Sequence, residues 1–320
     1  MTALRTRKPT GAVAWPLLLV EGAEKTGKSY ASFALSASPK VGRTFVFDFG
    51  EGTADEYAAL GPYEVIDHDG TFADFIAQLK AATEIPQVDG KPNVIVIDSA
   101  TVLWESIKDW ADGRARKSKK AQTALRNDPD ADISIPMNLW TDAGERWGQM
   151  TNALRYWPGI GVLIARGKEV AKVDGNGTPV TGQTEYKVEA HKSIGYAVSA
   201  RVRCEAPKRA VLTEARSLHA DIPPRGLLLP EANPLEHVVF DILGAGSEFA
   251  VSSAVLPQAT DAPVIDKVDA DRLVALMKAA ADPDEIKKAW HTRFGVWPSA
   301  LPVTRLAEAD DFLSDLEVTA

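Results

Sequence analysis

The chain has 320 residues, of which 45% are hydrophobic and 25% charged, and a formal net charge of −8. This composition is ordinary for a globular protein and excludes a chain coated with basic residues for nucleic acid, although it is compatible with a local basic patch. No run reaches the length of a membrane span, the basic first residues lack the apolar run of a signal peptide, and the single cysteine, Cys204, excludes an intramolecular disulfide, so we expect a cytoplasmic protein without membrane contact.

Short apolar runs separated by helical patterns predict an α/β domain. The runs cover residues 15–20, 43–49, 93–99 and 159–166. They are apolar without clean alternation, which is typical of strands buried on both faces of a parallel sheet. Helical patterns cover residues 29–37, 71–83 and 142–157. This order predicts a doubly wound, mostly parallel sheet.

The segment between the first run and the first helix reads "GAEKTGKS", which fits the G-x-x-x-x-G-K-[ST] pattern of a phosphate-binding P-loop. Its glycines let backbone N–H groups face a phosphate, and the helix N-terminus adds a positive dipole. Lys28 is expected to reach the β- and γ-phosphates of ATP, and the Ser29 hydroxyl to ligate Mg²⁺. Lys25, at the loop tip, could also face a neighbouring subunit. The predicted ATP-binding residues are Gly22, Ala23, Glu24, Lys25, Thr26, Gly27, Lys28, Ser29 and Tyr30.

Acidic residues end the second and third apolar runs. Asp98 closes "NVIVIDS", and paired with a P-loop it is expected to act on the metal as a Walker B aspartate, so Ser29 and Asp98 are the predicted Mg²⁺ ligands. No acidic residue follows Asp98 directly. The second run instead ends "FVFDFGEG", which places Asp48 and Glu51 at its carboxyl edge.

With "GAEKTGKS" and "VIVIDS", the chain resembles the RecA-like ATPases over residues 13–245, and in layout the phage-encoded single-strand annealing ATPases of the Sak-four type. The resemblance implies an ATPase that acts on single-stranded DNA in phage recombination or replication, by annealing or strand exchange, as a homo-oligomeric ring or filament in a bacterial host. It also implies that Glu51, or alternatively Asp48, positions the attacking water and is catalytic together with Lys28 and Asp98. After the fourth strand it implies a γ-phosphate sensor, here Arg166 or Lys168, acting within the subunit or across a subunit boundary.

A basic run at residues 113–126 lies between the third and fourth strands and lacks apolar periodicity, so we expect an irregular segment. Cations near one surface are sufficient for contact with a phosphate backbone, and a nearby Trp110 or Trp140 could stack single-strand bases. The alternative is a solvated loop whose charge is balanced by the acidic residues that follow. The candidate DNA contacts are Arg114, Arg116, Lys117, Lys119 and Lys120.

Beyond residue 168 the pattern predicts an antiparallel excursion around the "DGNG" turn at 174–177. Residues 197–205 then alternate, with Arg201 and Arg203 on one face, which predicts an antiparallel edge strand with a solvated face. A second basic group could contact DNA or a neighbouring subunit's nucleotide. It consists of Lys187, Lys192, Arg201 and Arg203.

The domain organisation follows from composition. We expect a RecA-like ATPase domain over residues 1–244, a linker of small, polar and proline residues over 245–264, and a small helical module over 265–320. Amphipathic patterns at 269–281, 282–295 and 306–318 predict three helices, with Trp290 and Trp297 in their core. This module could bind a replication or recombination protein.

Two other functions fit the same P-loop. A small-molecule kinase would use the basic run as a lid over its acceptor. A nucleotide-dependent scaffold would bind DNA or a replication partner with little turnover.

Overall fold

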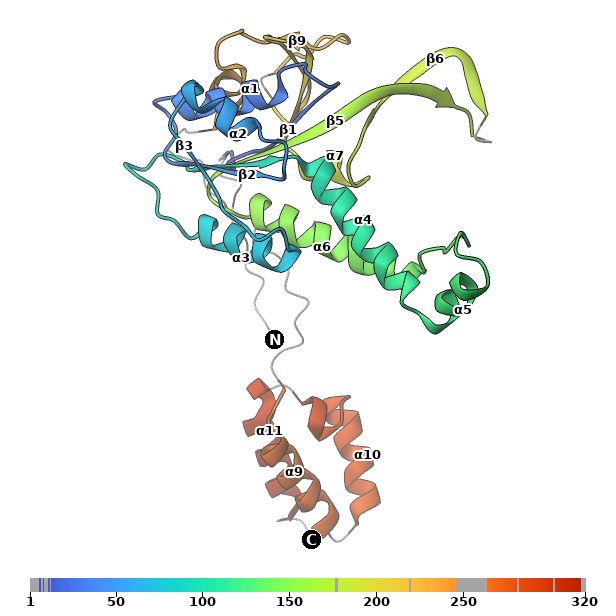
Figure 1. Ribbon diagram of the computed structural model, residues 1–320. Helices are drawn as coiled ribbons and strands as arrows, with labels where there is room; N and C mark the ends of the chain where they lie inside the picture. The colour runs from blue at the N-terminus through green and yellow to red at the C-terminus, as the bar shows by residue number, and fades with distance from the viewer. Residues whose placement is uncertain are drawn as a thin grey trace. The chain divides into compact units, whose positions relative to one another are not determined.

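The computed structural model describes residues 6, 8, 11, 13–175, 178–218, 220–245, 264–280, 282–301 and 303–317. The chain forms two compact units, Met1–Ala254 and Val255–Ala320 (Figure 1). The boundary between them falls within the predicted linker, most of which lies outside the described residues.

Within the described residues, the first unit is built on a mixed sheet of nine strands. Its main path runs β3 (Tyr63–Val65), β2 (Thr44–Asp48), β4 (Val94–Asp98), β5 (Ile160–Val173), β1 (Leu17–Gly22), β7 (Ala200–Ala206), β8 (Arg209–Ala215) and β9 (Leu227–Leu228). Neighbouring strands from β3 to β7 are parallel, and β8 and β9 continue the sheet antiparallel. The mostly parallel sheet with antiparallel strands at one edge confirms the predicted α/β fold class.

A long hairpin extends from the middle of the sheet. The second half of β5 pairs antiparallel with β6 (Pro179–Val188), and the two strands run out beyond their neighbours (Figure 1). This hairpin is the antiparallel excursion that the "DGNG" turn predicts, although two residues of the turn lie outside the described residues.

Helices cover both faces of the sheet (Figure 1). Residues of β1 alternate between two apolar cores, with Leu18 and Val20 in one and Leu17 and Leu19 in the other, which explains why this strand is apolar throughout. The first core includes α1 (Lys28–Phe33), α2 (Thr53–Glu56), α8 (Pro234–Glu236) and the π-helical turn His237–Ile242. The second includes α3 (Phe72–Thr83), α4 (Ala100–Arg116), α6 (Met137–Arg155) and α7 (Ile194–Ala197).

The sequence predicts β7 as an antiparallel strand at the edge of the sheet. In the structure β7 is parallel to β1 and does not lie at the edge. It pairs in parallel with β1, and β8 and β9 lie outside it. The error has a physical cause. Arg201 and Arg203 look like a solvated face in the sequence, but both guanidinium groups contact the buried carboxylate of Glu21 on β1.

The basic run is helical, so the expectation of an irregular segment was wrong. It forms the end of α4 and, after Ser118, a separate helix α5 (Lys119–Asn127). Ser118 caps α5 by accepting a hydrogen bond from the backbone N–H of Ala121. The buried residues here are small, Ala115 and Ala121 among them, so they leave no wide apolar stripe in the sequence.

The second unit contains the three predicted helices, α9 (Lys267–Ala279), α10 (Pro283–Phe294) and α11 (Leu306–Glu317). Asp282 caps α10 and Pro283 occupies its first turn. Trp290 is fully buried in the core of this unit, whereas Trp297 is 43% exposed, so its predicted core role was wrong. No helix within the described ranges combines the length and apolarity that a membrane crossing requires.

Candidate nucleotide-binding site

The P-loop connects the end of β1 to the start of α1 at the carboxyl edge of the parallel strands. Two of its positions need glycine. A Cβ on Gly22 would lie 2.5 Å from both the Cys204 carbonyl oxygen and Thr26 Oγ1, and Gly27 has a φ of +89°. The loop therefore closes tightly against β7 and directs the N-terminus of α1 towards the site.

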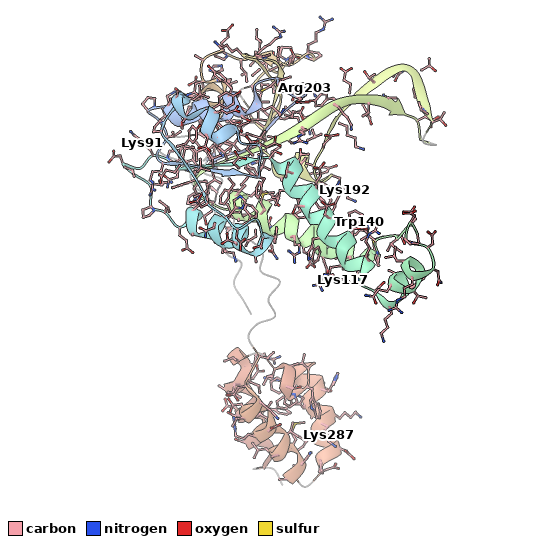
Figure 2. The ribbon with its side chains drawn as sticks, viewed as in Figure 1. Lys91, Lys117, Trp140, Lys192, Arg203 and Lys287 are labelled. Atoms are coloured by element: carbon pink, nitrogen blue, oxygen red, sulfur yellow. The ribbon has the colours of Figure 1, made fainter. Side chains whose placement is uncertain are left out.

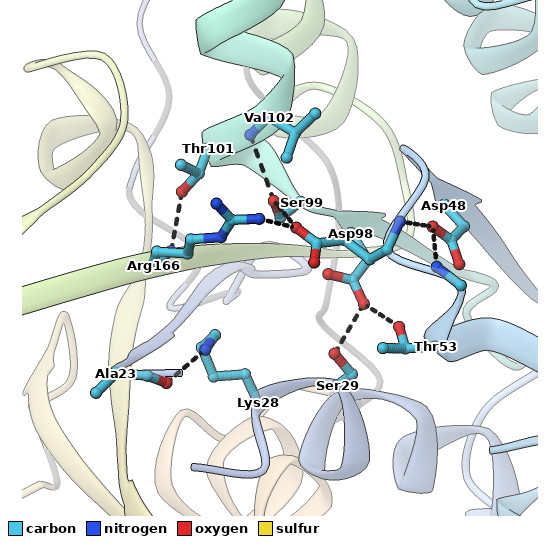
Figure 3. A network of polar contacts seen from close by, with 12 residues as sticks. Ala23, Lys28, Ser29, Asp48, Thr53, Asp98, Ser99, Thr101, Val102 and Arg166 are labelled. Carbon is cyan, nitrogen blue, oxygen red and sulfur yellow. Dashed lines mark hydrogen bonds and ion pairs between the residues drawn. The ribbon is translucent and has the colours of Figure 1, made fainter. Parts of the chain in front are cut away.

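Lys28 lies inside the curve of this loop. Its Nζ donates a hydrogen bond of 2.7 Å to the Ala23 carbonyl oxygen (Figure 3). Burial lowers the pKa of the Lys28 ammonium, and the nearby Cys204, Asp98 and Glu51 offset part of this effect. A partly desolvated cation at this position is suited to binding an anion.

Asp98 lies at the centre of the site, at the end of β4. Its Oδ2 accepts hydrogen bonds from Ser29 Oγ at 2.8 Å and Thr53 Oγ1 at 2.9 Å (Figure 3). The residue is 2% exposed, and burial raises the pKa of its carboxyl group against the lowering effect of the two hydroxyls. The structure therefore brings together the two predicted metal ligands and adds Thr53, which sequence reasoning missed. The only signal for Thr53 is a hydroxyl a few residues after the acidic strand end at Asp48, and that is too common to identify a site.

The two acidic residues after β2 have different roles in the fold. Both carboxylate oxygens of Asp48 accept backbone hydrogen bonds, from the N–H groups of Glu51, Gly52 and Ala54, and so hold the turn into α2. Glu51 instead points into the site. Its Oε1 accepts hydrogen bonds from Arg166 Nη2 at 2.6 Å and Ser99 Oγ at 3.2 Å.

The strand register explains why Glu51 and Asp98 lie close together. Asp48 is paired directly with Asp98 across β2 and β4, so the residues that follow these strands share one edge of the sheet. Arg166 reaches the same edge from β5, where its backbone N–H donates to Thr101 Oγ1 at 2.9 Å. Its bond to Glu51 raises the pKa of the guanidinium.

The other predicted site residues lie at the margin. Lys168 lies on β5 where the hairpin begins, and its Nζ lies 2.5 Å from Glu189 Oε1. Lys25 at the loop tip is 89% exposed and lies 3.7 Å from Glu24. The ring of Tyr30 packs edge-on against Tyr57.

The candidate DNA contacts divide into two groups. Two of the arginines are engaged within the fold, because Arg114 lies over the ring of Trp110 and Arg116 is 2.6 Å from Asp112. The Cζ atom of Arg146 also lies 3.9 Å from the centroid of the Trp110 ring. This ring is therefore already covered and is not free to stack a base. The three lysines of the group, Lys117, Lys119 and Lys120, are exposed and have no ion pair within the described part of the chain.

The residues at the carboxyl edge fit a nucleoside triphosphate with Mg²⁺. The glycine-dependent loop and Lys28 form a cradle for phosphate, and the oxygens of Ser29, Thr53 and Asp98 are the hard donors that Mg²⁺ prefers. A parallel sheet with this loop after β1 and acidic residues at or just after the ends of β2 and β4, two strands on the far side of β5, defines a P-loop nucleotide-binding domain. Residues 16–218 match the AAA domain family, and the chain belongs to this family.

Solved structures resemble the chain more weakly. The RadB recombinase is 14% identical with a TM-score of 0.37, covering 68% of this chain and 87% of its own. An ATPase from the type III secretion system of pathogenic bacteria is 14% identical with a TM-score of 0.28, over 59% of this chain and 50% of that one. No curated protein matches the chain.

Proposed function

We propose that the protein hydrolyses ATP at the P-loop and acts with it on single-stranded DNA in phage recombination or replication, by annealing or strand exchange. One observation carries the ATPase part. The P-loop hydroxyl of Ser29 is bonded to Asp98, and Glu51 lies in the turn after β2, the strand beside β4, with its carboxylate held at the same edge. Residues suited to binding phosphate, ligating a metal and acting as a general base thus lie at one edge of the sheet, which supports the proposal.

In the proposed mechanism Lys28 exchanges the Ala23 carbonyl for phosphate oxygens, and the P-loop N–H groups bind the same phosphates. Ser29 and Asp98 fit Mg²⁺, whose charge would offset that of the triphosphate. Glu51 orients the attacking water and accepts its proton on a carboxylate oxygen. Asp48 supports this step indirectly, because its hydrogen bonds hold the turn that carries Glu51.

Arg166 is the proposed γ-phosphate sensor. Its guanidinium is bonded to Glu51, so the ion pair holds the base while adding a donor that a phosphate oxygen can take over. Lys168 and Lys25 are exposed beside the site, and we propose that they face a neighbouring subunit of a ring or filament.

The proposed DNA contact is the end of α4 together with α5, residues 113–127, which we call the α4–α5 projection. Lys117, Lys119 and Lys120 are exposed on it, and Trp140, on α6, is 38% exposed and packs against Trp104 (Figure 2). Lysines with no ion pair among the described residues supply the mobile charge that phosphate binding needs, and an exposed indole can stack a base. We further propose that the C-terminal unit binds a replication or recombination protein.

ATP hydrolysis with and without single-stranded DNA tests the proposal. We expect DNA to stimulate turnover in the wild type. Lys28→Ala should abolish ATP binding, and Glu51→Gln should keep it but lose about 100-fold or more in turnover. Glu84→Gln, a carboxylate exposed at the end of α3 and outside the site, is the matched control and should hydrolyse normally. DNA-insensitive turnover that requires a small acceptor would support a kinase, and ATP binding without turnover a scaffold.

The DNA contact is tested separately. Lys117→Ala combined with Lys119→Ala should weaken binding of a single-stranded oligonucleotide about equally for every base sequence. Lys91→Ala is the control, because Lys91 lies on another side of the domain (Figure 2). Equal affinities for the double variant and the control would refute the assignment.

A further inference from the structure

A buried polar network joins the β5–β6 hairpin to the root of the P-loop. Glu21, the residue before Gly22, is fully buried at the end of β1. Its Oε1 accepts hydrogen bonds from Arg203 on β7, at 3.2 Å from Nε and 3.1 Å from Nη2. The same guanidinium lies 3.8 Å from the ring centroid of Tyr186 on β6, so three strands meet in one chain of contacts.

This network is incompletely bonded. Five buried side-chain polar atoms in the described part of the chain lack a hydrogen-bond partner, and three of them lie here: Glu21 Oε2, Arg201 Nε and the Tyr186 hydroxyl. Buried polar atoms in folded proteins are normally paired, because an unpaired one destabilises the fold. Burial also raises the pKa of the Glu21 carboxyl group, and the two arginines offset this only in part.

A small movement would complete part of the network. Glu21 Oε2 and Arg201 Nε are 3.8 Å apart, which exceeds a hydrogen bond by less than about 1 Å. A closer approach of these two atoms would give each of them the partner that it lacks.

The network is closely packed at both of its ends, at the hairpin and at the P-loop. A Cβ on Gly167 would lie 2.5 Å from the Tyr186 hydroxyl, so Tyr186 rests directly on the backbone of β5. At the other end the carbonyl of Cys204, the residue after Arg203, would lie 2.5 Å from a Cβ on Gly22. Contacts therefore run without a break from the hairpin through Arg203 and β7 to the P-loop.

We propose that Glu21, Arg203 and Tyr186 are positioning residues that couple the hairpin to the nucleotide site. Nucleotide binding at the P-loop shifts β1 against β7, completes the hydrogen bonds of the network and so protects the backbone hydrogen bonds of the hairpin. Because coupling is reciprocal, whatever binds the hairpin tightens nucleotide binding by the same factor. The inference rests on the proposed function only in requiring that the P-loop binds ATP.

Hydrogen exchange of the full-length protein tests the coupling, with and without a non-hydrolysable ATP analogue and Mg²⁺. In the wild type we expect the analogue to slow amide exchange in the described residues of the hairpin, 167–175 and 178–188, by about tenfold. Tyr186→Phe and Glu21→Gln should reduce this effect to less than about twofold. Tyr196→Phe is the matched control, because the Tyr196 side chain is 89% exposed, and it should respond like the wild type.

Thermal unfolding separates coupling from stability. Tyr186→Phe removes only a buried, unpaired hydroxyl, so without nucleotide its Tm should equal or exceed that of the wild type. A merely structural Tyr186 would leave the nucleotide response intact. The coupling is refuted if the analogue binds but the hairpin does not respond, or if Tyr186→Phe responds fully. Absence of analogue binding, measured by equilibrium titration, would instead refute the proposed function and the coupling with it.

Discussion

The substitution Asp98→Asn distinguishes two effects of the buried Asp98 charge, its effect on stability and its proposed role in binding Mg²⁺. The substitution keeps the shape of the side chain and an oxygen that can accept from Ser29 and Thr53, but removes the charge that suits the residue to Mg²⁺. Because burial raises the pKa of Asp98 above its ordinary value of 3.8, the folded protein binds that proton more tightly than the unfolded chain. The stability contributed by this group is present at acidic pH and is lost as the pH rises through the folded-state pKa.

The magnitude follows from the contacts of Asp98. Hydrogen bonds to a charged acceptor contribute about 1.5–3 kcal/mol and neutral ones about 0.5–1.5 kcal/mol, so two weakened bonds cost about 2–3 kcal/mol. Removing the buried charge also removes its desolvation penalty, which stabilises the folded state by several kcal/mol. The sum at neutral pH lies between zero and a small gain, and 1 kcal/mol corresponds to about 2–4 °C in a domain of this size. We expect the Tm of Asp98→Asn to be unchanged or up to about 6 °C higher.

Two measurements check this reasoning. Thermal unfolding from pH 4 to pH 8 without nucleotide should show the wild type losing stability relative to Asp98→Asn as the pH rises. ATP hydrolysis by the variant should fall at least about 100-fold, which is about 2.7 kcal/mol of activation free energy. A Tm more than about 10 °C below that of the wild type would mean that the charged Asp98 stabilises the fold through its hydrogen bonds to Ser29 and Thr53. Turnover within about tenfold of the wild type would mean that it does not hold the metal.

Three further predictions concern separate parts of the chain. Arg166→Ala should change stability by less than about 1 kcal/mol, because the side chains of Arg166 and Glu51 are 45% and 26% exposed, but should lower kcat at least about tenfold; an unchanged kcat would remove Arg166 from the mechanism. Lys119→Ala combined with Lys120→Ala should reduce the slope of log affinity against log salt for single-stranded DNA by about 1.4, as measured by fluorescence anisotropy, and an unchanged slope would place the contact elsewhere. Trp290→Ala should cost about 3–5 kcal/mol and unfold the C-terminal unit, seen as rapid proteolysis of residues 264–317, whereas resistance to the protease would contradict its place in that core.

The parts of the fold that the sequence predicts are those with local causes. The run at 94–97 is apolar because β4 is buried on both faces, and that pattern is visible without knowledge of any partner. The position of β7 has a remote cause. Arg203 looks solvated until Glu21, 182 positions away in the chain, is seen to be its partner. The helical basic run was missed because alanines such as Ala121 carry its packing.

The candidate site divides in the same way. The P-loop has a fixed spacing in the chain, so Lys28 and Ser29 follow from the motif, and an aspartate at the end of an apolar strand marks Asp98. Thr53 and the bond between Glu51 and Arg166 arise only when β2, β4 and β5 are placed side by side. No spacing rule relates residues that are brought together by sheet order.

The groups proposed to bind ATP are already bonded to one another within the chain. Lys28 donates to Ala23, Ser29 to Asp98, and Arg166 to Glu51. Nucleotide binding is then an exchange of hydrogen bonds, and its free energy is the difference between the new contacts and those given up. The exchange differs from group to group. The Ala23 carbonyl can turn to solvent at little cost, whereas release of Arg166 frees a carboxylate that can then act on water. It follows that Arg166 should affect turnover more strongly than affinity, and Lys28 the reverse.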